Sequence, residues 1–221
     1  MSARILNVKE DVLAANARKA ENTRRFLDKH HILMANVMSS PGSGKTSLIM
    51  ETIRHFDEMC SIAVIEGDIA SSIDSDKISQ LNIQTIQINT GGGCHLDALM
   101  IRKALDSIDL DATDLIFIEN VGNLVCTADF DLGAHKNVVI LSVPEGDDKP
   151  YKYPIMFVEA DVVLVNKTDV LPYFDFNLAD FPGIIEGLNP SAPVIPISAK
   201  TGKGMDAWFA WIDTMRSAQC D

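Results

Sequence analysis

The sequence predicts an α/β fold with a mostly parallel β-sheet, and three observations support this prediction. From residue 32 onward, short apolar runs alternate with helical stretches. Most of these runs are apolar at nearly every position, as in strands that are buried on both faces. One run leads through a Gly-rich loop into a helix, which is the order of elements in a phosphate-binding loop. At 221 residues, the chain is long enough for one such domain, with or without an appendage.

The first 30 residues predict an amphipathic helix that precedes the α/β pattern. Its apolar stripe at helical spacing consists of Ile5, Val8, Val12 and Ala15, widened by Leu13, Ala17 and Ala20. Asn7 and Glu10 have the spacing of a capping box. We therefore expect two parts, an N-terminal helix over residues 1–30 and an α/β domain over residues 31–221.

Seven apolar runs are the expected strands. They are Ile32–Met38, Ser61–Glu66, Gln84–Ile88, Asp114–Ile118, Asn137–Val143, Asp161–Val165 and Pro193–Ile197. The third run is the most polar, so we expect it near an edge of the sheet. Helical stretches, such as Leu96–Leu105, separate most of the runs and predict helices that cover the sheet.

Charge and cysteine content exclude several classes of function. The chain has 19 Lys plus Arg against 31 Asp plus Glu, a net charge of −12, which predicts no nucleic-acid partner. No apolar run approaches the roughly 18 residues of a membrane span, and the N-terminus lacks the apolar core of a signal peptide. Four cysteines without a CxxC pair favour reduced thiols. We expect a cytoplasmic protein with no membrane partner.

The Gly-rich loop after the first strand is the expected phosphate site. It reads Ser-Ser-Pro-Gly-Ser-Gly-Lys-Thr over residues 39–46, and Ser39 stands where the usual pattern has Gly. Backbone N–H groups and the helix N-terminus favour phosphates, Lys45 reaches the β- and γ-phosphates, and Thr46 binds Mg²⁺. The nucleotide-binding residues are Pro41, Gly42, Ser43, Gly44, Lys45, Thr46 and Ser47. The alternative is a Gly-rich turn without a ligand.

Two later loops predict that the base is guanine. The sixth run ends in Asn166-Lys167-Thr168-Asp169, which matches the NKxD signature of GTPases. The Asp169 carboxylate accepts hydrogen bonds from guanine N1–H and the 2-amino group, and adenine has no such donor pair. The seventh run ends in Ser198-Ala199-Lys200, which resembles the loop that lies against guanine O6. Residues 31–221 are therefore expected to form a GTP-binding domain with GTP, not ATP, as its ligand.

Carboxylates at strand ends are candidates for Mg²⁺ binding and catalysis. Glu119 and Gly122 stand where GTPases usually have D-x-x-G, so Glu119 is expected near Mg²⁺ and the Gly122 amide near the γ-phosphate. Asp68 and Asp74 follow the second run and are candidates for Mg²⁺ binding and for positioning water, with solvent-facing carboxylates as the alternative. Gly122 is followed by Asn123 rather than Gln, which predicts slow intrinsic hydrolysis.

A second constellation has the residue types of a transition-metal site. Cys94 and His95 precede a helix at the ligand side of the sheet, and Cys126 follows Gly122 by four residues. Two thiolates and one imidazole suit Zn²⁺ or Ni²⁺ and leave the shell incomplete, so that water or a second copy must complete it. On the residues alone, the alternative is that both cysteines are packed in the core as small hydrophobes.

The sequence also contains longer motifs, which are Gly93-Cys94-His95-Leu96-Asp97, Val121-Gly122-Asn123-Leu124-Val125-Cys126, Asp129-Phe130-Asp131-Leu132-Gly133, Glu145-Gly146-Asp147-Asp148-Lys149-Pro150 and Lys152-Tyr153-Pro154. With these motifs the chain resembles the HypB family, the nickel-insertion GTPases of [NiFe]-hydrogenase maturation. The resemblance covers about residues 1–215. It implies a SIMIBI-type P-loop NTPase fold and a GTP-dependent dimer that holds the metal between protomers with Cys94, His95 and Cys126. It also implies a HypA-type metallochaperone partner and a hydrogenase large subunit as recipient.

The sequence departs from some members of that family and leaves rivals. It has neither an N-terminal CxxCGC motif nor a His-rich tract, so a high-affinity N-terminal nickel site is not expected. Lys149 is a candidate to cross the dimer interface or meet the nucleotide, or else a surface lysine beside acidic neighbours; Cys60 and Cys220 are expected to be structural or incidental. The rivals are a urease accessory GTPase, whose Cys-Pro-His motif is missing here, a metal-independent regulatory GTPase and a P-loop kinase.

Overall fold

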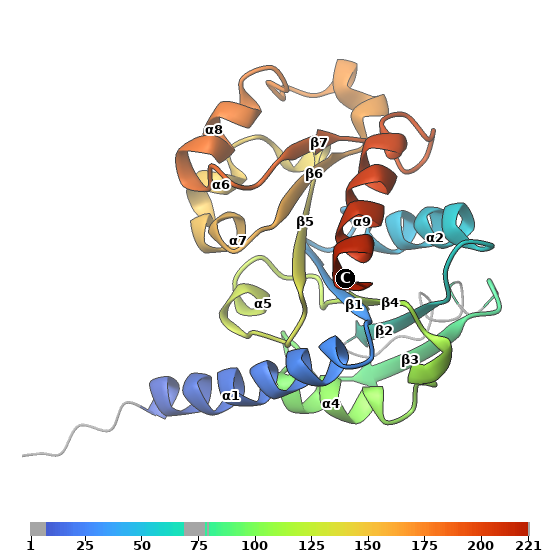
Figure 1. The fold of residues 1–221 in the computed structure, drawn as a ribbon. Helices are drawn as coiled ribbons and strands as arrows, with labels where there is room; N and C mark the ends of the chain where they lie inside the picture. Colours follow the sequence, from blue (N-terminus) through green and yellow to red (C-terminus); the bar gives the residue numbers. More distant parts are fainter. Residues whose placement is uncertain (1–7, 69–77, 79, 221) are drawn as a thin grey trace, which may run out of the picture.

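The computed structural model describes residues 8–68, 78 and 80–220, and its centre is a seven-stranded parallel sheet (Figure 1). The strand order is β3-β2-β4-β1-β5-β6-β7. The strands are β1 (Leu33–Ser39), β2 (Ile62–Asp68), β3 (Gln84–Asn89), β4 (Leu115–Glu119), β5 (Lys136–Ser142), β6 (Val162–Asn166) and β7 (Val194–Pro196). All seven expected runs are confirmed to within two residues, and the polar β3 lies at an edge as predicted.

Helices cover both faces of the sheet (Figure 1). They are α1 (Val8–Asp28), α2 (Lys45–Phe56), α4 (Ala98–Leu105), α5 (Cys126–Asp129), α6 (Lys149–Lys152), α7 (Pro154–Val158), α8 (Phe181–Leu188) and α9 (Met205–Cys220). Short 3₁₀ turns occupy Leu110–Ala112, Val143–Glu145 and Thr168–Tyr173. The α/β class is confirmed.

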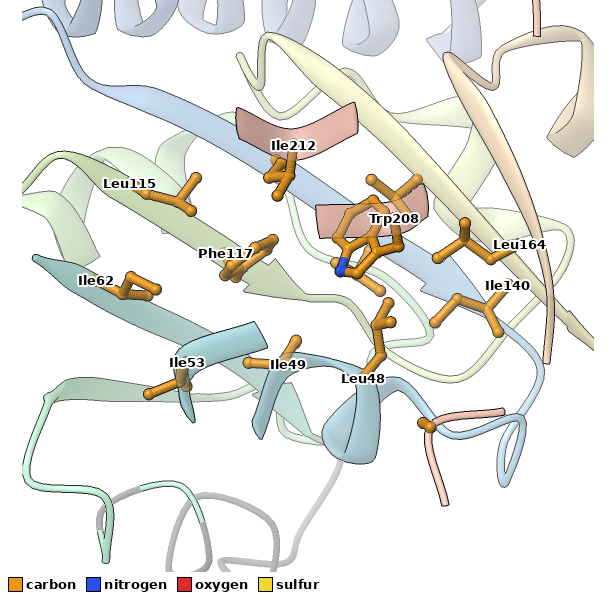
Figure 2. Close-up of a cluster of buried hydrophobic side chains, with 14 of the residues drawn as sticks. Leu48, Ile49, Ile53, Ile62, Leu115, Phe117, Ile140, Leu164, Trp208 and Ile212 are labelled. Atoms are coloured by element: carbon orange, nitrogen blue, oxygen red, sulfur yellow. The ribbon is translucent and has the colours of Figure 1, made fainter. Parts of the chain in front are cut away.

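The sheet has an apolar core on each face because successive residues of its buried strands point to opposite sides. On one face, Leu33, Ala35 and Val37 of β1 pack with α2 and α9, where the fully buried Trp208 donates a 2.8 Å hydrogen bond from Nε1 to Thr52 Oγ1 (Figure 2). On the other face, Met34 packs toward α1 and α4, and the side chains of α7 and α8 form a third cluster.

The topology gathers polar side chains at one edge. Because all strands are parallel, their carboxyl ends meet there, and ligands of such sheets bind outside these ends. The last residues of β1, β2, β4 and β6 are Ser39, Asp68, Glu119 and Asn166. The predicted phosphate, Mg²⁺ and base residues thus lie along one line of strand ends.

The buried face of α1 differs from the predicted apolar stripe. Val12 is 50% exposed and Ala17 is exposed, so this part of the prediction is wrong. Of the predicted stripe, Ala20 is buried, together with Asn16, Thr23 and Leu27. Two of these four residues are polar, because the helix packs against α4 and the segment before β5 partly through hydrogen bonds. An apolar stripe cannot identify such a face.

The N-terminal part of the helix prediction remains open. Ile5 and Asn7, and with Asn7 the capping box, lie outside the described residues, as does the side chain of Val8. The division at residues 30 and 31 stays a prediction. Leu27 and Ile32, on either side of it, are both fully buried in the same apolar cluster.

Candidate nucleotide and metal site

The phosphate-binding loop joins the end of β1 to the start of α2. Lys45 is buried, and its Nζ lies 3.1 Å from Ser39 Oγ at the first position of the loop. The Ser39 hydroxyl in turn donates to the Ser40 carbonyl at 2.7 Å. Ser39, which replaces the usual Gly, therefore contacts Lys45, the lysine of the phosphate-loop motif.

Asn166 of the NKxD motif ties the phosphate loop to the base loop. Its Nδ2 donates to the Ser43 carbonyl at 2.9 Å, and its Oδ1 accepts from Ala199 N at 3.1 Å. Gly44, with φ of +105°, faces this amide so closely that a Cβ would lie 2.4 Å from Asn166 Nδ2. Only a glycine fits there without displacing Asn166. The two predicted nucleotide loops are thus joined directly.

The expected base site is a cavity of about 540 Å³ beside these loops. Its lining residues are Gly44, Ser47, Met50, Glu51, Arg54, Asn166, Lys167, Asp169, Val170, Ala199 and Lys200. Asp169 Oδ1 accepts a 2.6 Å hydrogen bond from Ser198 Oγ, and this bond lowers the pKa of the carboxyl. Lys167, with φ of +61°, donates from Nζ to the Gly42 carbonyl at 2.6 Å. The ionised Asp169 is therefore a ready acceptor for two N–H donors.

The expected phosphate and Mg²⁺ site is a second cavity, of about 460 Å³. It is lined by Pro41, Gly42, Gly44, Lys45, Thr46, Ser47, Glu66, Gly67, Asp68, Glu119, Asn120, Val121 and Gly122. Thr46 Oγ1 donates to Glu119 Oε1 at 2.7 Å, and the carboxylates of Asp68 and Glu66 line the same space. Hydroxyl and carboxylate oxygens are the ligands that Mg²⁺ takes, so this donor set fits it.

Two acidic residues of this region, Asp74 and Glu66, have different outcomes. Asp74 lies outside the described residues, and its role stays a prediction. Glu66 was not predicted as a site residue, although it is buried and lines the cavity, two residues before Asp68 in β2. A carboxylate within an apolar run was the signal that could have found it.

Glu145 contacts the phosphate loop, a contact that the sequence analysis did not predict. Its Oε1 accepts from Ser43 Oγ at 2.7 Å, and from the amide and hydroxyl of Ser142 at 2.8 and 2.7 Å. Ser142 and Glu145 form a capping box at the start of the 3₁₀ turn Val143–Glu145. The spacing Ser-x-x-Glu was the signal for this arrangement.

The candidate metal ligands approach one another within the single chain. The Cys126 thiol interacts with the side chain of Cys94, and this interaction, ahead of burial, raises the pKa of Cys126. Cys94 Sγ lies 3.6 Å from His95 Nδ1, and the His95 ring stacks on Phe130 with centroids 3.8 Å apart. In the part of the chain that the structure describes, no three His, Cys, Asp or Glu side chains form a cluster able to hold a metal ion.

Asn123 connects the phosphate loop to the Cys126 turn. Its backbone N–H donates to the Ser39 carbonyl at 2.9 Å. Its side-chain Oδ1 accepts from the amides of Val125 and Cys126 at 2.7 and 2.9 Å, and its carbonyl accepts from Thr127 Oγ1 at 2.6 Å. A single residue thus anchors the cysteine-bearing turn to the first residue of the phosphate loop.

The Cys94 segment is connected to the Mg²⁺ side of the site. Thr90 N donates to the Asp68 carbonyl at 3.0 Å, and Thr90 Oγ1 donates to the Gly93 carbonyl at 2.8 Å. A Cβ on Gly67 would lie 2.7 Å from Leu96 Cδ1, so the end of β2 and this segment are in close contact. Both cysteine segments therefore touch elements that line the phosphate cavity.

The remaining candidates lie away from these cavities. Lys149 Nζ lies 5.8 Å over the Tyr153 ring, and the neighbouring Asp148 pairs with Lys152. Cys60 packs against the apolar core, and burial raises its pKa to about 11, as expected of a structural thiol. The side chain of Cys220 is outside the described part of the structure.

Comparison with known proteins decides between the families. Residues 33–196 match the protein-family model described as CobW/HypB/UreG, nucleotide-binding domain. The hydrogenase maturation factor HypB of Escherichia coli K12 is 47% identical over 215 residues, which are 97% of this chain and 74% of that protein. The chain belongs to the HypB family.

Solved HypB structures have the same fold. HypB from Helicobacter pylori, crystallised in complex with nickel, has a TM-score of 0.87 and 37% identity, over 94% of this chain and 97% of that one. HypB from Archaeoglobus fulgidus has a TM-score of 0.86 and 38% identity, over 92% of this chain and 100% of that one.

The predicted resemblance to the HypB family and the predicted P-loop fold are confirmed. The family comprises P-loop GTPases of hydrogenase maturation, so the alternative of a P-loop kinase does not hold. Among the described residues, no helix has the length and apolar character to cross a membrane.

Proposed function

We propose that this chain is a GTP-hydrolysing switch that binds nickel or zinc with Cys94, His95 and Cys126 and assists nickel insertion into [NiFe] hydrogenase. One observation carries the proposal: Asn123 is hydrogen-bonded both to the phosphate loop and to the turn that bears Cys126. A change at the nucleotide therefore reaches a candidate metal ligand through one residue. The nickel complex of the Helicobacter pylori relative supports the choice of metal.

The nucleotide half of the switch uses groups with defined tasks. Lys45 neutralises charge on the β- and γ-phosphates, and Asp169 selects guanine. Thr46, Asp68 and Glu119 would hold Mg²⁺, which supplies further neutralisation of the charge that develops on the phosphoryl group. Catalytic roles are assigned to Lys45, Asp68, Asp74 and Glu119.

Intrinsic hydrolysis is expected to be slow because Asn123 does not substitute for the water-positioning Gln of other GTPases. Its side-chain oxygen already accepts two backbone N–H groups, from Val125 and Cys126. The residue that follows the D-x-x-G position thus serves the metal side of the protein rather than the attacking water.

The metal half of the switch is incomplete in one protomer. Cys94 and Cys126 are half-buried rather than fully enclosed, which favours ligands over core packing. Thiolate and imidazole donors suit Zn²⁺ and Ni²⁺. A second copy related by a two-fold axis would bring the same three donors to the shared ion, so we propose a homodimer in the GTP-bound state.

Membership of the family supports the cellular role that we propose. We propose a cytoplasmic protein that works with a HypA-type metallochaperone and delivers to a hydrogenase large subunit. The metal is cargo, so its affinity has to change during the cycle. Because coupling between sites is reciprocal, metal binding changes GTP affinity by the same factor by which GTP changes metal affinity.

Replacement of Asp169 by Asn is expected to exchange guanine for xanthine specificity. The amide cannot accept from both guanine N–H donors, and loss of charge-assisted hydrogen bonds worth roughly 1.5–3 kcal/mol lowers GTP affinity about 10- to 100-fold. Its NH₂ group donates instead to the 2-oxo group of xanthine. Competition of GTP, XTP and ATP against a fluorescent guanine nucleotide measures this, with Asp175→Asn, an exposed position, as control. Unchanged GTP affinity in Asp169→Asn would contradict the assignment of the base.

The mass of the complex gives the number of chains, nucleotides and Ni²⁺ ions in it, and so tests whether two chains share one metal site. Native mass spectrometry of the protein with Mg²⁺, Ni²⁺ and a non-hydrolysable GTP analogue is expected to show two chains, two nucleotides with their Mg²⁺ ions, and one Ni²⁺ ion. Omission of Mg²⁺ is expected to reduce the nucleotide-bound dimer, because Thr46 and Glu119 then lack the ion that links them to the phosphates. One Ni²⁺ ion on each separate chain in the presence of the analogue would contradict a ligand shell shared between copies.

A further inference from the structure

Helix α1 packs against the two segments that follow the candidate metal ligands in the chain. It packs along α4, which follows Cys94 and His95 in the chain (Figure 1). It also contacts Asp131, in the segment that follows α5, and α5 begins at Cys126. Neither the nucleotide cavity nor the phosphate cavity is lined by an α1 residue. The helix therefore adjoins the metal side of the molecule and not the GTP side.

Asn16 on α1 binds both of these segments through one side chain. Its Oδ1 accepts from the backbone amide of Ala98 at 2.9 Å, at the first residue of α4. Its Nδ2 donates to the carbonyl of Asp131 at 2.7 Å. Ala98 comes three residues after His95, and Asp131 comes five residues after Cys126. One carboxamide thus spans the gap between the two ligand-bearing segments.

The environment of Asn16 makes this bridge specific. The residue is only 8% exposed, and a buried amide is costly unless its hydrogen-bonding groups are used. Arg24 holds the Asp131 side in place, with its Nη2 at 3.0 and 3.1 Å from the two carboxylate oxygens and its Nε at 3.2 Å from the Ala134 carbonyl. A Cβ on Gly133 would lie 2.5 Å from the Ala20 carbonyl, so this segment lies directly on the helix.

We propose that Asn16 is a positioning residue of the metal site. It holds the segment that carries Cys94 and His95 at a fixed distance from the segment that carries Cys126. Metal affinity depends on ligand positions to within about 0.2 Å, and residues that orient ligands typically alter affinity 10- to 100-fold. Displacement of α1 therefore changes metal affinity without any change in the ligands. This inference rests on the proposed metal function.

The test compares Ni²⁺ and Zn²⁺ affinity of the full chain and its variants by competition with a chromogenic chelator. Asn16→Ala removes both hydrogen bonds; the nearly isosteric Asn16→Asp keeps an acceptor for Ala98 and loses the donor to Asp131. Both are expected to lower metal affinity 10- to 100-fold and to weaken the Ni²⁺–thiolate absorption band. The affinity of the metal-free protein for a GTP analogue is expected to stay within twofold of wild type.

Two controls separate positioning from general destabilisation. Asn22→Ala changes an exposed asparagine on the same helix and is expected to bind metal as wild type does. Thr52→Ala removes the hydrogen-bond partner of Trp208 on the opposite face of the sheet, so it destabilises the fold away from the metal segments. Equal losses of metal affinity in Thr52→Ala and Asn16→Ala would overturn the inference.

Failure of the inference and failure of the proposed function give different results. If the wild type binds metal and Cys126→Ala does not, but both Asn16 variants bind as tightly as wild type, the positioning role of Asn16 is wrong and the metal function stands. If the wild type binds no metal, or Cys126→Ala binds as tightly as wild type, the proposed function fails and the inference fails with it.

Discussion

Replacement of Lys45 by Ala is expected to lower the rate of GTP hydrolysis by about 100- to 1,000-fold, the range found when one preorganised donor to transition-state charge is removed. Lys45 is buried at the start of α2, with Nζ held 3.1 Å from Ser39 Oγ at the phosphate cavity. The variant leaves that cavity without the cation that the γ-phosphate charge requires.

Single-turnover release of phosphate from GTP measures this effect. Lys203→Ala serves as the control, because Lys203 is exposed and lines neither cavity. Circular dichroism establishes whether the Lys45 variant is folded. A folded Lys45→Ala protein that hydrolyses GTP at the wild-type rate would contradict the assignment of this loop as the catalytic phosphate site.

Replacement of Cys126 by Ala is expected to weaken Ni²⁺ and Zn²⁺ binding by about 100-fold. Structural zinc sites with four ligands bind with about 10–16 kcal/mol, which corresponds to roughly 3 kcal/mol for each ligand lost. The Cys126 side chain interacts with that of Cys94, and Cys126 lies on the turn that Asn123 holds. Its loss therefore removes a thiolate ligand, and it is the candidate ligand that Asn123 connects to the phosphate loop.

Cys60→Ala is the matched control for this variant. Cys60 is also a free cysteine, but it packs against the core near α9 and lies far along the chain from the candidate ligands. We expect Cys60→Ala to bind Ni²⁺ and Zn²⁺ as wild type does, and Mg²⁺-supported GTP hydrolysis without Ni²⁺ or Zn²⁺ to be similar in both variants. Undiminished Zn²⁺ and Ni²⁺ binding in Cys126→Ala would favour the metal-independent regulatory GTPase.

The sheet and the nucleotide loops were predictable because their signals are local. Strands such as Val162–Asn166 are buried at every position, so an uninterrupted apolar run identifies them. The phosphate loop and the NKxD motif owe their residues to backbone geometry and base chemistry that recur at fixed spacing. Their order along a parallel sheet then predicts that they meet, as the bond between Asn166 and Ser43 shows.

Features that depend on tertiary contact were not predictable in the same way. The face of α1 was assigned wrongly because Asn16 and Thr23 are buried by neighbours that periodicity does not reveal. The link from Asn123 to Cys126 is local, but its attachment to Ser39 depends on how β1 and β4 pair. The metal site was not predictable from local spacing either. Three side chains in one chain make an incomplete ligand shell, and spacing cannot specify a second copy.

The most direct test of the switch is a titration of Ni²⁺ into wild type and Asn123→Ala, each with GDP and with a non-hydrolysable GTP analogue. For wild type we expect the two nucleotides to give affinities that differ at least about fivefold, the lower end of coupling between linked sites. For Asn123→Ala, which loses the two side-chain hydrogen bonds to the amides of Val125 and Cys126, we expect the two affinities to become equal while GTP binding is retained. Equal affinities in wild type, or the full difference preserved in Asn123→Ala, would contradict a switch that works through this residue.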